Sequence, residues 1–232
     1  GFFPVGGNPL WWGHVLAGLM AVEALHLDVL VMRVQGEIRY KQLPETDRVP
    51  VKARHEIARQ LLAHFWPLIR YTDLGREPGN DREGAEELYR FLALNAQTRL
   101  HAFYLLGIES QERVERYLAQ HYEAACRHGL GDNPLHALTI GWIQRGAYGA
   151  QVTLRELQER SRVHAQRAAR AEPLDVALVQ DPQIDLHGSS TYYRNTHDSA
   201  IVPRIVHEHT SAPLGFNDSK AILVRDTKED KP

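Results

Sequence analysis

Apolar positions along the chain follow two spacings that alternate from the amino end onward. Apolar residues at helical spacing predict helices at residues 15–25, 52–65, 83–95, 110–127 and 153–171. Short apolar runs typical of strands lie at residues 28–34, 67–72, 100–106, 137–143 and 176–179, and a further strand is expected before Gly6. Strands that alternate with helices in this way build parallel sheets through βαβ crossovers. We therefore predict an α/β fold: a doubly wound, Rossmann-like parallel sheet with helices on both faces.

The same pattern predicts how the chain is divided. A length of 232 residues suits one large α/β domain. The periodic pattern covers residues 1–210, whereas residues 211–232 lose it and end in a run of charged side chains. We predict a single domain over 1–210, followed by a polar and poorly ordered tail over 211–232.

Loops that follow the strands are the places where chemistry is expected. Sheets of this kind bind ligands outside the carboxyl ends of their strands. The loops concerned are residues 6–14, 35–41, 73–80, 107–110 and 145–149. Candidate functional residues are therefore sought there first.

Charge and cysteine content narrow the classes of partner. The chain has 27 Lys and Arg against 29 Asp and Glu, a net charge of −2, so no global basic field attracts nucleic acid or an anionic membrane. Any anion site must be local. A single cysteine, Cys126, excludes an internal disulfide framework and any multi-cysteine metal site. We expect a reducing, cytoplasmic location.

The apolar amino end is too short and too interrupted to predict a membrane partner. The longest apolar stretch, residues 8–22, contains Gly13 and His14 and is shorter than the roughly 20 residues of a membrane helix. Glycines and Pro9 interrupt the start of the chain and no Lys or Arg precedes them, so no secretory leader is expected.

Several catalytic motifs are missing from the sequence. It lacks GxxxxGK[ST], GxGxxG, GxSxG and HExxH, so P-loop hydrolysis, ordinary dinucleotide redox chemistry, α/β-hydrolase chemistry and zincin chemistry lose their main support. His207 and His209 stand two residues apart on a predicted helix and point in different directions. We assign no metal site.

A glycine-containing turn, Gly-Gly-Asn-Pro-Leu-Trp-Trp-Gly-His, spans residues 6–14 between the first strand and the first helix. Glycines allow the backbone to approach a phosphate, and a helix start offers unpaired N–H groups. His14 can add a further donor. The alternative is purely structural: Gly13 permits close helix packing and His14 is a buried polar residue.

A second segment, Gly-Ser-Ser-Thr-Tyr-Tyr-Arg, spans residues 188–194 after the last strand. Consecutive hydroxyls at a helix start cap the helix and offer donors to phosphate, while Arg194 supplies a forked cation one turn later. The structural alternative is an ordinary helix cap with a surface arginine.

Taken together, the two segments resemble the HxGH and ISSTxxR nucleotidyltransferases, most closely the nicotinate or nicotinamide mononucleotide adenylyltransferases. That family opens its first helix with [DN]-P-x-H-x-G-H, and this chain matches it at Asn8, Pro9, Gly13 and His14. Further matches, over about residues 6–209, are Lys41 after the second strand, Gly107, Glu109 and Ser110 after the fourth, Arg145-Gly146, Ser189, Ser190, Thr191 and Arg194, and Val202-Pro203.

The resemblance implies adenylyl transfer from ATP with Mg²⁺ to nicotinate or nicotinamide mononucleotide, releasing pyrophosphate in NAD biosynthesis. By the same resemblance, His14 contacts the α- and β-phosphates of ATP, Arg194 the β- and γ-phosphates, and Lys41 the phosphates or the acceptor. The implied nucleotide-binding residues are Gly7, Asn8, Trp11, Gly13, Gly107, Glu109, Arg145, Ser189, Ser190 and Thr191. The expected partners are ATP and a mononucleotide, and homo-oligomer formation stays open.

The chain departs from the family pattern in ways that leave alternatives open. Trp11 stands where the family has its first histidine, Gly188 replaces an isoleucine, and Glu109 replaces an aspartate. Residues 112–135 and 151–172 look longer than the family core. The alternatives are a transferase of the pantetheine-phosphate adenylyltransferase or cytidylyltransferase kind, or a catalytically impaired relative that binds a nucleotide.

Overall fold

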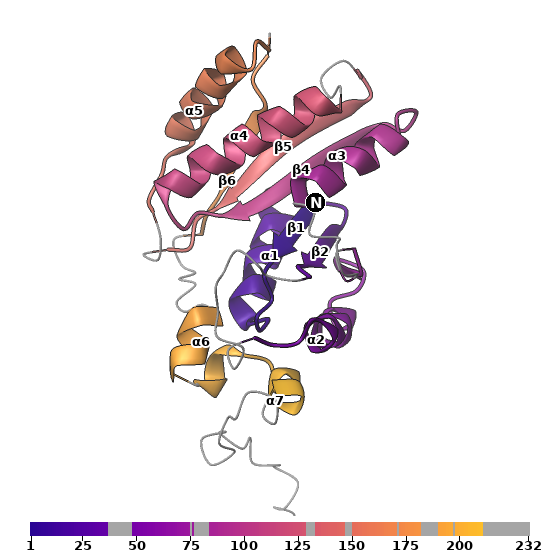
Figure 1. Cartoon of the computed structure of the whole chain (residues 1–232), viewed down its shortest axis with the longest axis vertical. Coiled ribbons are helices and arrows are strands. Elements are labelled where there is room, and N and C mark those ends of the chain that lie inside the picture. Colours follow the sequence, from indigo (N-terminus) through magenta and orange to yellow (C-terminus); the bar gives the residue numbers. More distant parts are fainter. Residues whose placement is uncertain are drawn as a thin grey trace, which may run out of the picture.

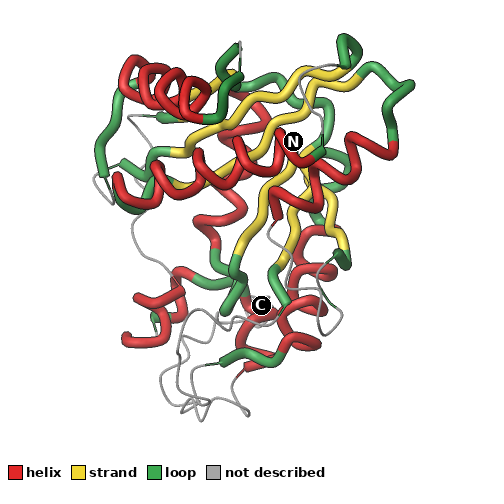
Figure 2. Tube along the Cα trace, turned by 45° about the horizontal axis from the view of Figure 1, so that its top comes forward, coloured by secondary structure: helices red, strands yellow, loops and turns green. Residues whose placement is uncertain are grey.

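Six parallel strands form a single sheet in the computed structural model, which describes residues 1–36, 48–74, 76, 84–128, 133–146, 150–170, 172–181, 190–196 and 198–210. The strand order is β3-β2-β1-β4-β5-β6. The strands are β1 (Phe2–Val5), β2 (Leu30–Val34), β3 (Ile69–Thr72), β4 (Leu100–Gly107), β5 (His136–Ile143) and β6 (Asp175–Val179). Figure 2 shows them running side by side through the molecule. The strands expected from the sequence are confirmed, within a few residues at their ends.

Helices follow the strands in alternation (Figure 1). They are α1 (Trp12–Ala24), α2 (Val51–Ala63), α3 (Gly84–Leu94), α4 (Gln111–Arg127), α5 (Leu154–Arg167), α6 (Ser190–Thr196) and α7 (Arg204–Thr210), with a 3₁₀ turn at Ser199–Ile201. None of the helices within the described ranges has both the length and the apolar character needed to cross a bilayer. The predicted domain limit at residue 210 stays a prediction, because residues 211–232 lie outside the described part.

Both faces of the sheet are buried, as the doubly wound prediction requires. Alternation along β1 sends Phe3 and Val5 into a core with α1 and α2, and Phe2 into the opposite core with α3, α4 and α5. Trp142 of β5 is fully buried in the second core. A parallel sheet with covered faces is therefore the observed fold.

Strands β1 and β4 are neighbours but separate early. They share one pair in register, Phe2 with Tyr104, whereas β4 and β5 pair at eight positions from Leu100 to Gly107. The chain passes from one face of the sheet to the other between these two strands. The carboxyl end of a doubly wound sheet opens into a crevice at such a point.

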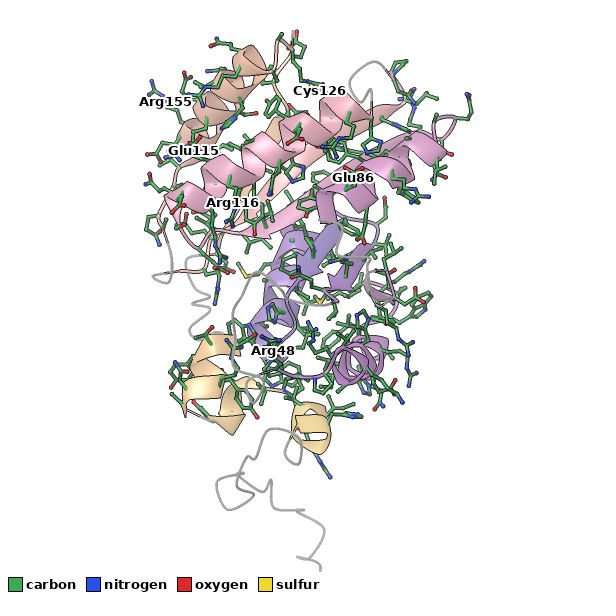
Figure 3. The ribbon with its side chains drawn as sticks, viewed as in Figure 1. Arg48, Glu86, Glu115, Arg116, Cys126 and Arg155 are labelled. Carbon is green, nitrogen blue, oxygen red and sulfur yellow. The ribbon has the colours of Figure 1, made fainter. Side chains whose placement is uncertain are left out.

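Polar side-chain contacts join α4 to its neighbours α3 and α5 on this face of the sheet. Glu86 of α3 contacts Arg127 and His128 at the end of α4, each at 2.8 Å (Figure 3). Toward the start of α4, Glu115 contacts Arg160 and His164 from α5, each at 2.9 Å. These contacts fix the helix whose start faces the crevice.

We predict that stability falls in mild acid because His121 of α4 is fully buried. Burial lowers its pKa to about 3, while its Nδ1 lies 3.0 Å from the Tyr89 hydroxyl. Between pH 6.5, the approximate pKa of an unfolded histidine, and pH 3, the imidazole is protonated in the unfolded chain and neutral in the folded chain. His121 alone should cost about 2 kcal/mol of unfolding free energy between pH 6.5 and 5, measured by urea unfolding.

The control is His121→Gln, which retains hydrogen-bonding capacity and does not titrate in this range. His55 has a pKa lowered to about 4 by burial and by the Arg54 charge, so some pH dependence should persist in this variant. An unchanged pH dependence in His121→Gln would contradict the prediction.

Candidate functional site

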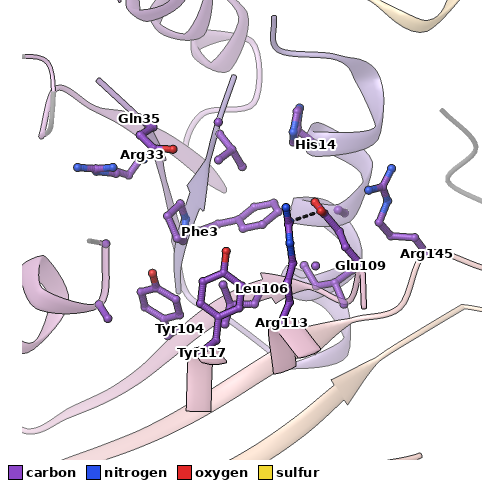
Figure 4. Close-up of a pocket in the computed structure, with 18 of the residues that line it drawn as sticks. Phe3, His14, Arg33, Gln35, Tyr104, Leu106, Glu109, Arg113, Tyr117 and Arg145 are labelled. Atoms are coloured by element: carbon purple, nitrogen blue, oxygen red, sulfur yellow. Dashed lines mark ion pairs between the residues drawn. The ribbon is translucent and has the colours of Figure 1, made fainter. Parts of the chain in front are cut away.

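A cavity of about 470 Å³ opens at the crevice between β1 and β4 (Figure 4). Its volume lies in the usual range of small-molecule sites. Its wall comes from the end of β1, the start of α1, the end of β4 with the following loop, and the first half of α4. The lining side chains include Phe3, Trp11, His14, Arg33, Gln35, Tyr104, Leu106, Glu109, Arg113, Arg116, Tyr117, Gln120, His121 and Arg145.

The cavity concentrates positive charge in a chain whose net charge is slightly negative. Among the described residues that line it, four are arginines and one, Glu109, is acidic. Glu109 forms an ion pair with Arg113 one turn along the chain, drawn dashed in Figure 4. The excess of guanidinium groups favours an anionic ligand.

Arg33 is held rigidly at one side of the cavity. Its Nε lies 2.7 Å from Oε2 of Glu87 and its Nη2 donates to Oε1 at 2.8 Å, so strand β2 and helix α3 are joined by a two-point contact. The two side chains are 3% and 6% exposed. Such a pair survives burial because the fork of the arginine matches the carboxylate.

His14 is oriented by the start of its own helix. The imidazole Nδ1 accepts a hydrogen bond from the Trp11 backbone N–H at 3.3 Å, and the backbone N–H of His14 donates to the Trp11 carbonyl at 3.0 Å. A neutral imidazole that accepts at Nδ1 carries its proton on Nε2. In its neutral form, His14 therefore carries its ring proton on Nε2.

Trp11 fills the space above Gly13. Its indole is 5% exposed, and the Arg145 guanidinium lies 5.3 Å from the ring centre. A Cβ added to Gly13 would clash with the Trp11 indole. The structural interpretation of Gly13, close packing, is thus supported, although the partner is the indole of the residue two positions earlier.

The loop between β1 and α1 meets the second motif segment. Ser190 Oγ donates to the Pro9 carbonyl at 2.8 Å, and Arg194 Nη1 donates to the Asn8 carbonyl, 186 positions away in the sequence. Gly7 has a φ of +58°, a backbone conformation that side chains other than glycine rarely adopt. The two segments singled out in the sequence are therefore side by side.

The predicted site residues fall into three groups. Those on the cavity wall are Trp11, Gly13, His14, Gly107, Glu109 and Arg145. Those on or against the loop, outside that lining, are Gly7, Asn8, Ser190, Thr191 and Arg194. Lys41 and Ser189 lie outside the described residues. The role of each stays a prediction.

Helix α4 contributes cavity residues that the sequence analysis missed. Arg113, Arg116, Tyr117 and Gln120 line the cavity from one face of the helix. Their spacing of three to four residues was the available signal. Polar positions at that spacing also describe a solvated helix face, so the sequence alone did not separate the two.

The sheet order and the burial of both faces define a doubly wound, Rossmann-like α/β fold. Nicotinic acid mononucleotide adenylyltransferase of Plasmodium falciparum complexed with APC has a TM-score of 0.53 and 10% identity, covering 92% of this chain and 91% of that one. Its complex with NaAD has a TM-score of 0.50 and 13% sequence identity, covering 84% of this chain and 81% of that one. No protein-family model and no curated protein matches the chain. These two likenesses establish the fold.

We predict that Gly13→Ala destabilises the protein because the new methyl group must displace the Trp11 indole. Overpacking of this kind costs about 1–3 kcal/mol in unfolding free energy, measured by urea unfolding. Gly107→Ala is the matched control, since its Cβ would meet only Arg145 Cδ, at 3.9 Å. A smaller side chain at position 11 should reduce the cost, so Trp11→His with Gly13→Ala completes a double-mutant cycle. Equal stability of the two alanine variants would contradict the packing argument.

Proposed function

We propose that the protein transfers the adenylyl group of Mg·ATP to the phosphate of nicotinate mononucleotide, releasing pyrophosphate and forming a dinucleotide. The observation that carries this proposal is the meeting of residues 8–14 with residues 190–194 beside a cation-rich cavity. The fold shared with an adenylyltransferase supports it. Nicotinamide mononucleotide is the second acceptor to be compared.

The start of α1 is the proposed ATP side of the site. Backbone N–H groups at a helix start, with the dipole behind them, favour phosphate. His14 would donate from Nε2 to the α- and β-phosphates. Arg194 and the Ser190–Thr191 helix start are the proposed partners of the β- and γ-phosphates, with Mg²⁺ entering bound to the triphosphate.

Helix α4 is the proposed acceptor side. The Arg116 guanidinium lies 5.3 Å from the Tyr117 ring centre, and Tyr104 lies on the same cavity wall. Aromatic rings suit a planar base, and guanidinium groups suit a phosphate or a carboxylate. The positive charge of this wall favours the carboxylate of nicotinate over the uncharged carboxamide of nicotinamide.

The chemistry requires positioning rather than a covalent nucleophile. An oxygen of the acceptor phosphate attacks the α-phosphorus of ATP in line, forming a new P–O bond. The bond between that phosphorus and the bridging oxygen breaks, and pyrophosphate leaves with the electron pair. Fixed donors such as His14 Nε2–H and Arg145 would stabilise negative charge on the phosphoryl oxygens without reorganising.

The first test measures pyrophosphate released from ATP, Mg²⁺ and nicotinate mononucleotide. We expect turnover, a higher kcat/KM with nicotinate than with nicotinamide mononucleotide, and a loss of about 100-fold in kcat for His14→Ala, as for removal of one aimed donor. Pyrophosphate no higher than in the His14→Ala sample would overturn the proposal. Release only with phosphopantetheine, or with CTP in place of ATP, would assign another acceptor or nucleotide.

The second test separates the two sides of the site. Arg116→Met should raise KM for nicotinate mononucleotide about tenfold, as expected for a charge-assisted contact, and leave KM for ATP nearly unchanged. Arg155→Met, an exposed arginine on α5, is the matched control (Figure 3). A rise confined to KM for ATP would contradict the assignment of α4 to the acceptor.

A second candidate function is nucleotide binding without turnover, and Trp11 is the observation that favours it. The indole occupies the position of the motif's first histidine and is buried against Gly13, so no imidazole stands there. Indole N–H can donate but carries no positive charge. A melting temperature raised by ATP, with no pyrophosphate from any acceptor tested, would support this candidate over the enzyme.

A further inference from the structure

Arg54 is a buried arginine that lies behind the wall of the cavity. It comes from the first turns of α2 and is 4% exposed. Its guanidinium donates to four backbone carbonyls: Nε to Val49 at 3.0 Å, Nη1 to Gly6 at 3.1 Å and to Gln35 at 2.8 Å, and Nη2 to Gly36. One side chain thereby joins the ends of β1 and β2 to the start of α2.

Two of those carbonyls come from residues that line the cavity, Gly6 and Gln35. The following loop is tied to the same place: Asn8 Oδ1 accepts from the Val49 N–H at 2.7 Å, and the Val49 carbonyl accepts from Arg54. The β1 loop, residues 6–9, is thus held by α2 at one end and by α6 at the other.

The direction of these contacts matters for an anionic ligand. Carbonyl oxygens that faced a phosphate would repel it. The carbonyls of Gly6 and Gln35 instead accept hydrogen bonds from the Arg54 guanidinium. In a trans peptide unit the N–H points opposite to the carbonyl. The N–H of Gly7, which shares its peptide unit with the Gly6 carbonyl, therefore points away from Arg54.

We propose that Arg54 is a positioning residue, which fixes the β1 loop in the conformation that binds a triphosphate through hydrogen bonds to backbone carbonyls. The identity of the ligand rests on the proposed function; the effect on the loop does not. A loop held in its binding conformation before the ligand arrives avoids an ordering cost at the moment of binding.

Only an arginine meets the geometric demand at this position. Four carbonyls from three segments need a planar fork with five N–H donors, whereas a lysine offers a single ammonium with three. Arg54→Lys therefore keeps the charge and loses part of the geometry. Arg54→Met removes both and keeps a side chain of similar length.

The test compares Arg54→Met and Arg54→Lys in the full chain with Arg59→Met, a change on the same helix at an arginine that is 60% exposed and paired with Glu56. The first readout is amide hydrogen exchange without ligand. In Arg54→Met we expect the amides of residues 6–8 and 35–36 to exchange about tenfold faster or more, and those of residues 100–107 of β4 to stay unchanged. The exchange rates of Arg54→Lys should lie between those of Arg54→Met and the parent, and those of Arg59→Met should match the parent.

The second readout is kinetic. KM for ATP should rise about tenfold in Arg54→Met while kcat changes by less than about threefold, because the loop binds the triphosphate but does not itself react. If Arg54→Met does not fold, Arg54→Lys is tested by the same two readouts, and the expected changes in exchange rate and in KM are smaller.

Three outcomes would overturn the inference. They are exchange at residues 6–8 equal to that of Arg59→Met, faster exchange spread evenly over the whole sheet, and an unchanged KM for ATP with a collapsed kcat. Absence of pyrophosphate in the parent would instead overturn the proposed function, and the exchange readout would still decide the role of Arg54.

Discussion

The separation of β1 from β4 is the constraint on which the rest of the molecule depends. Their single pair, Phe2 with Tyr104, leaves the carboxyl ends of both strands without each other's hydrogen bonds. Helices leave toward opposite faces on the two sides of that gap, so no crossover covers it. The cavity, the start of α1 and the cationic face of α4 all lie around this opening.

Charge is arranged so that the opening is positive although the chain is not. Some arginines near it are committed to structure: Arg33 binds Glu87, and Arg54 binds carbonyls at the ends of β1 and β2. Buried guanidinium groups are tolerated there because carboxylate or carbonyl oxygens accept from them, and removing one partner would leave an uncompensated charge. Arg116 and Arg145 instead lie against aromatic rings, each guanidinium 5.3 Å from the ring centre of Tyr117 or Trp11.

The sequence predicts almost the whole fold but only part of the candidate site. Apolar spacing is a local property, so the six strands and the main helices could be predicted from it. The meeting of residues 8–14 with residues 190–194 could be predicted only through a family resemblance. The contacts of Arg33, Arg54 and Glu87 could not be predicted, because a charged residue in a strand or helix reads as solvated until the tertiary path supplies its partner.

Trp11 shows how a motif can change its chemistry and keep its architecture. The indole packs on Gly13, lies 5.6 Å from the His14 ring centre, and has the Arg145 guanidinium beside it. A histidine at this position would leave space above Gly13, whereas the tryptophan fills that space. The helix start, the orientation of His14 and the loop contacts of Arg54 and Arg194 do not depend on an imidazole at position 11. The loop between β1 and α1 is therefore held by its backbone contacts and its anchors, without an imidazole at position 11.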